Sequence, residues 1–242
     1  MSTIALQSKF QAPKKSYDVI HYLPFSSDLK LQAMEIAGRG TYLLGAFDMI
    51  VPELSAEVKA EIDQALKAGN RIIGLAHSQG HLKDRVVPQD AVLLALILIK
   101  DVVKEDARDI IAYFKSQDVD VKIISGDYPD TVAAIAKDVG VTGKAIISAD
   151  IPEDMIELQK VVKETSIFGR VTPPQKRNII QALQNNGHTT CMVGDGINDI
   201  LALKQSDCAI AFASGSESTK VVANFLLLEN EFSPLPNVVK EV

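Results

Sequence analysis

The feature that most constrains this chain is a regular alternation of short apolar runs and amphipathic helix patterns from Ala91 onward. The runs are short, apolar at nearly every position and bounded by polar residues, which is typical of strands buried on both faces. The expected strands are 91–99, 121–124, 145–147, 166–168, 189–193, 208–212 and 224–228. Strands of this kind that alternate with helices predict an α/β fold with a doubly wound, mostly parallel sheet.

The expected helices lie between these strands and carry ordinary start and stop signals. They are 106–116, 130–139, 152–163 and 173–187. Pro173 and Pro174 open the last of them, where proline is tolerated because a first-turn amide has no partner within the helix. In doubly wound sheets, function sits at the carboxyl ends of the strands, and the polar clusters of this chain fall at those ends.

The residues before Ala91 predict a smaller, β-rich domain. Strands are expected over 18–23, 31–37, 41–46 and 71–76. The loop 38–40 carries two glycines and indicates a hairpin, and Ser55 can cap a helix that Gly69 ends. The polar stretch 80–89 contains Pro88 and reads as a hinge. We therefore expect two domains, 1–88 and 89–242.

Composition narrows the classes of partner and the location of the chain. The net charge of −6 disfavours nucleic acid and anionic membrane surfaces. The longest apolar run, 91–99, is far shorter than the roughly twenty residues of a spanning helix. The first fifteen residues are too polar for a signal peptide. The chain alone is thus expected to be soluble.

The cysteines and histidines give no sign of a metal site. Cys191 and Cys208 lie in separate apolar runs and are expected to be reduced thiols in the core. His77 and His81 are four residues apart, but Ser78 and Gly80 between them favour a turn over a helix face that could hold a metal ion.

The strongest candidate for chemistry is Val-Gly-Asp-Gly-Ile-Asn-Asp at 193–199, directly after an apolar run. The glycines that flank Asp195 allow a tight turn and a close backbone approach to a ligand. Asp195 and Asp199, with Asn198 as a neutral donor, suit a hard cation such as Mg²⁺. The same residues would also form an ordinary turn in which Asn198 or Asp199 caps the next helix.

Two further candidates follow other strands. Ser125, Gly126 and Asp127 directly follow the run 121–124, where a hydroxyl and a free amide can hold phosphate oxygens; taken alone, they are better explained by a plain turn. Lys176 lies in the first turn of helix 173–187 and can neutralise a phosphoryl group, although a lone lysine is usually only solvated. Together they supply a hydroxyl, a cation and a carboxylate pair, which phosphoryl transfer needs around a nucleophilic aspartate.

In this order the motifs resemble those of the haloacid-dehalogenase-like superfamily. The strings are Ser-Gly-Asp (125–127), Pro-Pro-Gln-Lys (173–176) and Gly-Asp-Gly-Ile-Asn-Asp (194–199). The longer match through 206–216 is similar to the phosphorylation domain of P-type cation-transporting ATPases. Asp-Val-Val-Lys at 101–104 stands where that family usually has Asp-Pro-Pro-Arg. The resemblance implies a Rossmann-like sheet in which Asp195, with Asp199, binds Mg²⁺.

The resemblance also assigns roles to the other motif residues. Lys176 and the Ser125 hydroxyl would hold the phosphoryl group, with Gly126 and Asp127 supporting the phosphate loop. Asn198 and Asp199 would order the magnesium shell.

The first domain resembles part of the ATPase nucleotide-binding domain. In Pro-Phe-Ser-Ser-Asp-Leu-Lys (24–30), the resemblance implies that Phe25 stacks on adenine and that Lys30 approaches ATP. Leu44-Gly45-Ala46 stands where the family often has Lys-Gly-Ala, and the leucine departs from that pattern. Arg71 matches an arginine that reaches the phosphates of the nucleotide. Each also has a plain interpretation, Phe25 as core and Lys30 and Arg71 as surface.

The family nucleophile lies in Asp-Lys-Thr-Gly-Thr, and the sequence contains no such string. The resemblance thus implies a fragment that lacks one sheet strand. Its partners would be ATP and the rest of the pump at the cytoplasmic face of a membrane. The cation would bind elsewhere, and the isolated chain would not autophosphorylate. Two alternatives remain: a free-standing phosphatase with Asp48 as nucleophile, whose usual second acid is replaced by Ile50, and a nucleotide-binding remnant without turnover.

Overall fold

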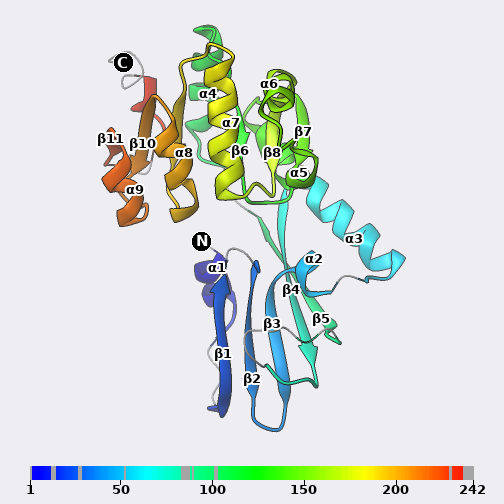
Figure 1. Ribbon diagram of the computed structural model, residues 1–242. Coiled ribbons are helices and arrows are strands. Elements are labelled where there is room, and N and C mark those ends of the chain that lie inside the picture. Colours follow the sequence, from blue (N-terminus) through cyan, green and yellow to red (C-terminus); the bar gives the residue numbers. More distant parts are fainter. Residues whose placement is uncertain are drawn as a thin grey trace. The chain divides into compact units, whose positions relative to one another are not determined.

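The computed structural model describes residues 2–11, 15–26, 29–51, 53–82, 88, 90–100, 103–228 and 231–236. The residues group into two compact units, Met1–Asp101 and Val102–Val242, and each is described by itself. Figure 1 labels most of their helices and strands. None of the helices within the described ranges combines the length and the apolar character needed to cross a membrane.

The first unit is built on a five-stranded antiparallel sheet with strand order β1-β2-β3-β4-β5. Its strands are β1 (Val19–Ser26), β2 (Leu31–Ile36), β3 (Gly40–Ala46), β4 (Asn70–Ser78) and β5 (Val92–Lys100). A short helix, α1 (Ser2–Lys9), precedes them. The hairpin predicted around 38–40 is confirmed as β2 and β3, and Gly38 and Gly40 adopt the positive φ values of 66° and 77° that the tight turn requires.

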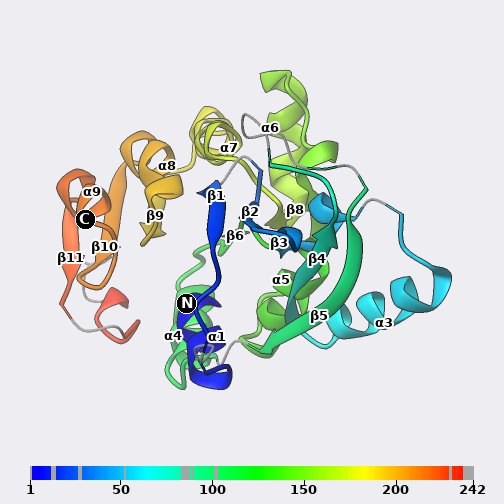
Figure 2. The ribbon, with the colours of Figure 1, turned by 90° about the horizontal axis from the view of Figure 1, so that it is seen from below.

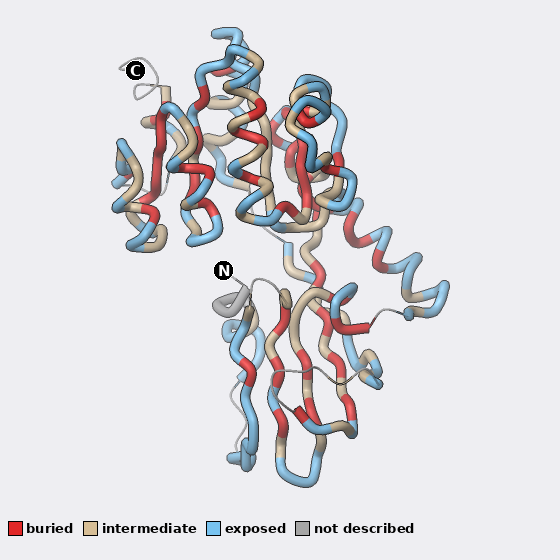
Figure 3. The backbone as a smooth tube through the Cα atoms, viewed as in Figure 1, coloured by how far each residue is buried: buried red, intermediate tan, exposed pale blue. Residues whose placement is uncertain are grey.

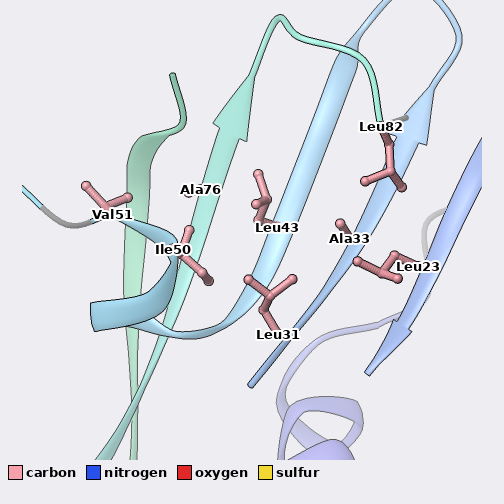
Figure 4. Packing of buried hydrophobic residues seen from close by; sticks show 8 residues of the cluster. All are labelled: Leu23, Leu31, Ala33, Leu43, Ile50, Val51, Ala76 and Leu82. Carbon is pink, nitrogen blue, oxygen red and sulfur yellow. The ribbon is translucent and has the colours of Figure 1, made fainter. Parts of the chain in front are cut away.

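One face of this sheet is apolar and forms the core of the first unit (Figure 4). Alternate residues of β2 and β3 point into it because side chains change face at every step along a strand. Helix α2 (Phe47–Ile50) and the segment at Leu82 cover the face. The buried side chains are Leu23, Leu31, Ala33, Leu43, Ile50, Val51, Ala76 and Leu82.

Helix α3 (Ala56–Lys67) connects α2 to β4 and has the boundaries that its sequence predicts. The Ser55 hydroxyl accepts a hydrogen bond from the Val58 amide at 3.3 Å, which is the predicted cap. Gly69 follows the helix with a φ of 77°, so a left-handed residue ends it as expected.

The strand expected to open the second domain belongs instead to the first unit. It is present as β5 and pairs antiparallel with β4, with Ile97 opposite Ile73. The boundary between the units therefore follows Asp101 and not residue 88. A run that is apolar at nearly every position has no period that assigns it to one sheet or the other. Leu93 packs against the core of the first unit, and this tertiary contact cannot be predicted from the apolar run alone.

The second unit contains two three-stranded parallel sheets, with orders β11-β10-β9 and β6-β8-β7. Figure 2 shows β9 beside β10 in one sheet and labels β6 and β8 of the other. The strands are β6 (Ile123–Ile124), β7 (Lys144–Ile147), β8 (Thr165–Gly169), β9 (Cys191–Gly194), β10 (Cys208–Phe212) and β11 (Phe225–Leu227). The α/β class with parallel sheets is thus confirmed, and the parallel strands are divided between two sheets.

The helices of the second unit follow its strands closely. They are α4 (Ala107–Ser116), α5 (Pro129–Asp138), α6 (Met155–Glu164), α7 (Pro173–Asn185), α8 (Ile200–Gln205) and α9 (Glu217–Val222), with short 3-10 turns η1 (Ser148–Asp150) and η2 (Ile197–Asp199). Strands β8 and β10 are the most buried part of the unit (Figure 3). Ile124 packs against apolar clusters on the side of each sheet, so the two sheets share a core at the end of β6.

The two cysteines are closer than their sequence positions indicate. Cys191 of β9 and Cys208 of β10 are direct partners on neighbouring strands. Cys208 is buried, but Cys191 is exposed, so only one of them is the core thiol that was expected. Although the residue as a whole is exposed, partial burial of its sulfur, together with the adjacent Cys208 thiol, raises the pKa of Cys191 to about 12, which keeps it protonated at neutral pH.

Candidate functional site

The loop after β9 places Asp195 at the carboxyl end of a parallel strand. Asp195 and Asn198 are exposed, while Asp199 is 8% exposed. Asp199 Oδ2 accepts a hydrogen bond from the Gly196 amide at 3.1 Å. A Cβ atom at Gly194 would lie 2.7 Å from Cβ of Asp199, so this glycine is required for the carboxylate to fold back under the loop.

Lys176 and Asp199 form a buried ion pair beneath this loop. The Lys176 ammonium donates to Asp199 Oδ1 at 2.6 Å, and Lys176 is 7% exposed. Helix α7 positions the lysine one turn from its start, where Gln175 and Thr172 form a capping box. A buried charge is tolerated only when it is paired and hydrogen-bonded, so each residue fixes the position of the other.

The loop after β6 is attached to the residues that lead into α7. The Ser125 amide donates to the Phe168 carbonyl at 2.9 Å, and the Ser125 carbonyl accepts from the Val171 amide at 3.0 Å. The Ser125 hydroxyl accepts from the Asp127 amide at 3.1 Å, which forms a tight turn around Gly126. Val171 directly precedes the capping box of α7, so this turn and Lys176 are supported by the same segment.

The structure thereby links the three predicted motifs into one bonded series. It runs from Ser125 to Val171, through the start of α7 to Lys176, and across the ion pair to Asp199 and the Asp195 loop. All three motifs stand just beyond the ends of strands or at the start of a helix within one unit. The roles assigned to the individual residues stay predictions.

The donors at this site fit a hard divalent cation. Asp195 is exposed, and among the described residues none donates a hydrogen bond to its carboxylate, while Asn198 follows three residues further along the same loop. Both oxygens of Asp199 are already engaged, by Lys176 and by the Gly196 amide. The geometry therefore suits Asp195 as a direct ligand and Asp199 as its support. The described part of the chain contains no cluster of three acidic, histidine or cysteine ligands, so further oxygens would come from water, backbone or substrate.

The predicted nucleotide residues lie in the first unit. Phe25 is 62% exposed on β1 and so is not core. The Lys30 carbonyl accepts from the Ala46 amide at 2.9 Å, and a Cβ at Gly45 would meet that carbonyl, so the structure brings Lys30 and Gly45 into contact. Arg71 is half-buried on β4. Ser27 and Asp28 of the same motif lie outside the described residues.

The alternative nucleophile, Asp48, has a different setting. It lies in α2, directly after β3. Strand β3 is paired antiparallel on both sides, with β2 and with β4. It therefore cannot serve as a strand of the parallel sheets that carry the other motifs, and the structure gives the phosphatase alternative no support.

Two groups of polar residues have no signal in the sequence pattern. Glu35 is 2% exposed on β2 and accepts hydrogen bonds from His81 at 2.6 Å, from His21 at 2.9 Å and from the Leu82 amide at 3.0 Å. The bond from His81, followed by that from His21, lowers the pKa of Glu35 to about 2. The second group, around Thr219, contacts the backbone of the Asp195 loop. Their partners are distant in sequence, and although the longer match through 206–216 includes Ser216, it gives no sign of this contact.

Comparisons with known proteins identify the family to which the sequence is similar. A family model described as "haloacid dehalogenase-like hydrolase" matches residues 25–207. A probable cation-transporting ATPase, exp7, from Streptococcus pneumoniae is 44% identical over 93% of this chain and 29% of its own length. The calcium-transporting ATPase CtpE from Mycolicibacterium smegmatis is 36% identical over 99% of this chain and 30% of its own length. A calcium-transporting ATPase from Bacillus subtilis is 28% identical over 94% of this chain.

The chain spans about three tenths of the length of the curated relatives it matches. The matches cover nearly the whole of this chain, so both units share the resemblance. The match to the family model and the three strand-end motifs lead to one conclusion: the chain belongs to the haloacid dehalogenase-like hydrolases, and its relatives over most of its length are cation-transporting ATPases.

Proposed function

We propose that this chain is the cytoplasmic, ATP-handling part of a P-type cation pump. In this proposal the first unit binds ATP and the second unit takes part in Mg²⁺-dependent phosphoryl transfer to an aspartate outside the chain. The aspartyl-phosphate would then be hydrolysed to drive transport through membrane segments that also lie outside it. Which cation is carried depends on those segments.

The bonded series from Ser125 through Lys176 to the Asp195 loop is the observation that supports the proposal most. Phosphoryl transfer needs a cation, hydrogen-bond donors and a metal ligand around one reacting group. In this series the Ser125 hydroxyl would donate to a phosphoryl oxygen, and Lys176 would contribute positive charge while Asp199 holds it in place. Asp195 and Asn198 would hold Mg²⁺, which when bound supplies additional positive charge to the phosphoryl oxygens.

The division of the parallel strands supports the expectation of a missing strand. Strands β9 and β6 each have a single partner strand among the described residues, β10 and β8 respectively. Each precedes one of the reactive loops. An unpaired edge exposes backbone donors and acceptors that a further strand can satisfy. We propose that the strand with the nucleophilic aspartate pairs with these edges.

The first unit is proposed to bind ATP through an aromatic side chain and two cations. Exposed Phe25 offers a face for stacking on adenine. Lys30 lies at a turn that contacts Gly45, and Arg71 would contact phosphate oxygens in the manner typical of guanidinium groups.

The affinity of the chain for MgATP, measured by titration calorimetry, tests the proposed role of the first unit. We expect Lys30→Ala and Arg71→Ala each to weaken binding about tenfold, the loss of roughly 1.4 kcal/mol of a charge-assisted contact. Lys59→Ala is the matched control, since Lys59 is an exposed cation on α3 of the same unit. Unchanged affinity in both test variants would remove these residues from the site, and no binding by the unaltered chain would contradict the proposal that the first unit binds ATP.

A chromogenic phosphate ester with Mg²⁺ tests the phosphatase alternative directly. We expect no turnover by the isolated chain because its sequence lacks the nucleophile string. Turnover that Asp48→Asn abolishes would contradict the pump proposal and establish the free-standing phosphatase.

A further inference from the structure

We infer that the segment Gly215–Thr219 is a positioning element that fixes the direction of the Asp195 side chain and thereby sets the affinity of the site for Mg²⁺. The inference rests on the proposed role of Asp195 as a metal ligand. It assigns a role to residues that lie beyond the catalytic motifs, at the start of α9.

The peptide group between Asp195 and Gly196 is held at both of its ends. Its carbonyl, which belongs to Asp195, accepts a hydrogen bond from the Ser216 amide at 2.8 Å. Its N–H, which belongs to Gly196, donates to Asp199 Oδ2 at 3.1 Å. A planar peptide group that is fixed at both ends cannot rotate about its long axis. The two hydrogen bonds therefore fix the peptide group that follows the Asp195 Cα. Because the carboxylate is attached through this Cα, its direction is restricted as well.

These two supports come from different parts of the unit. Asp199 is held by Lys176 of α7, whereas Ser216 belongs to the loop that begins α9. The Lys176–Asp199 pair therefore holds one end of the peptide and the Ser216 amide holds the other. Loss of either support would leave the peptide free to rotate.

Gly215 allows this contact because it has no side chain. A Cβ atom there would lie 2.9 Å from the Asp195 carbonyl oxygen and 3.2 Å from the Asp195 Cα. It would also lie 2.9 Å from the Phe212 carbonyl oxygen. All three are backbone atoms, which cannot move aside as the end of a flexible side chain does. Gly215 is thus required for close approach and not for a left-handed conformation.

Thr219 fixes the position of the Ser216 amide. It is fully buried, and its hydroxyl donates to the Ser216 carbonyl at 2.7 Å. The Thr219 amide donates to the Ser216 hydroxyl at 3.2 Å, which caps α9. The Thr219 hydroxyl oxygen also lies 3.5 Å from the Asp195 carbonyl oxygen, so this side chain is close to the loop that it helps to support. Residues 215–219 are therefore held in one conformation by hydrogen bonds, and they support the Asp195 loop.

The inference is tested by measuring the Mg²⁺ dissociation constant of the chain. Mg²⁺ is added stepwise, and binding is detected by the shifts of the amide NMR signals of residues 194–199. We expect Gly215→Ala to raise the Mg²⁺ dissociation constant about tenfold, because the added methyl group displaces the Asp195 backbone. Thr219→Val removes only the hydroxyl and is expected to raise the dissociation constant about threefold, as the loss of one hydrogen bond does. Thr219→Ser, which keeps the hydroxyl, is expected to restore it.

Ser218→Ala is the matched control, since Ser218 is an exposed neighbour on α9. If the unaltered chain does not bind Mg²⁺, the proposed function fails and the inference fails with it. If the chain binds Mg²⁺ and Gly215→Ala and Thr219→Val bind it equally well, the inference alone is overturned. Should Gly215→Ala fail to fold, the Thr219→Val and Thr219→Ser pair decides, since a purely structural role would lower thermal stability without a change in the dissociation constant.

Discussion

In the first unit, five strands form one continuous antiparallel ladder, whereas the second unit divides its strands into two three-stranded parallel sheets. The first sheet is held by backbone hydrogen bonds along its whole width and by one apolar face. In the second unit, side chains and loops connect the strand ends: the Lys176–Asp199 pair, the Ser125–Val171 bond and the apolar contacts of Ile124. The contrast indicates that polar interactions help to hold the second unit together at the strand ends where the proposed chemistry would take place.

The largest expected effect is on this polar connection. Lys176→Met leaves the Asp199 carboxylate buried without its cation, which costs about 3 to 5 kcal/mol. We expect urea unfolding to show this loss, and hydrogen exchange to locate it in α7 and η2 while strands β1–β4 keep their protection.

The control is an ion pair of the same type on the surface. Lys220 donates to Glu217 at 2.8 Å, but the Glu217 side chain is 90% exposed. Lys220→Met is expected to cost less than about 1 kcal/mol because water already solvates the pair. Equal losses in the two variants would show that burial does not distinguish the pairs, and the comparison between the units would lose its basis.

The second prediction concerns the apolar face of the first unit. Leu43 is fully buried at the centre of this face. Leu43→Ala is expected to destabilise the first unit by about 2 to 5 kcal/mol through lost burial and a cavity. Hydrogen exchange should then show the loss across β1–β4 together, because one ladder connects them.

Val92→Ala is the matched control on β5, where Val92 is 65% exposed. It is expected to change the free energy of unfolding by less than about 0.5 kcal/mol. If Leu43→Ala loosened only β3 and left its neighbours protected, the ladder would not be the cooperative unit that the comparison assumes.

Elements with local signals could be predicted from the sequence. The hairpin at 38–40, the cap at Ser55 and the proline start of α7 each depend on residues a few positions apart. The sheet to which β5 belongs could not be predicted, since its run is apolar throughout and its partner is chosen by packing. The site shows the same limit: Lys176 and Asp199 were predicted as separate functional residues, but their buried pairing depends on how α7 packs beside η2.

The support for the Asp195 loop was missed for a related reason. Gly215 and Ser216 support the loop through backbone atoms, which leave no signal in the sequence. Thr219 supports it through a hydroxyl, and a threonine near the start of a helix is too common to indicate such a role. Glu35 has no local signal either, because its buried position is explained only by His81 and Leu82, which are distant in the chain. Such contacts become visible only when the strands and loops are placed in space.

The smallest predicted effect is the pH dependence of stability that Glu35 confers. It tests the comparison within the first unit, because Glu35 is a buried polar group in a unit held mainly by its strand ladder and apolar face. Its pKa is lowered from 4.5 to about 2 by the bonds from His81 and His21, so the folded state favours the ionised carboxylate. This stabilisation is fully present above about pH 4.5 and is lost as the pH falls toward 2, where the carboxylate is protonated in both states. Glu35→Gln should therefore be less stable than the unaltered chain at neutral pH, and the difference in unfolding midpoint should narrow in acid.

Glu61→Gln, at an exposed position on α3, should show no such pH dependence. A difference between Glu35→Gln and the unaltered chain that stays constant with pH would mean that the three hydrogen bonds act as neutral contacts, and the first unit would then depend on its ladder and apolar face alone.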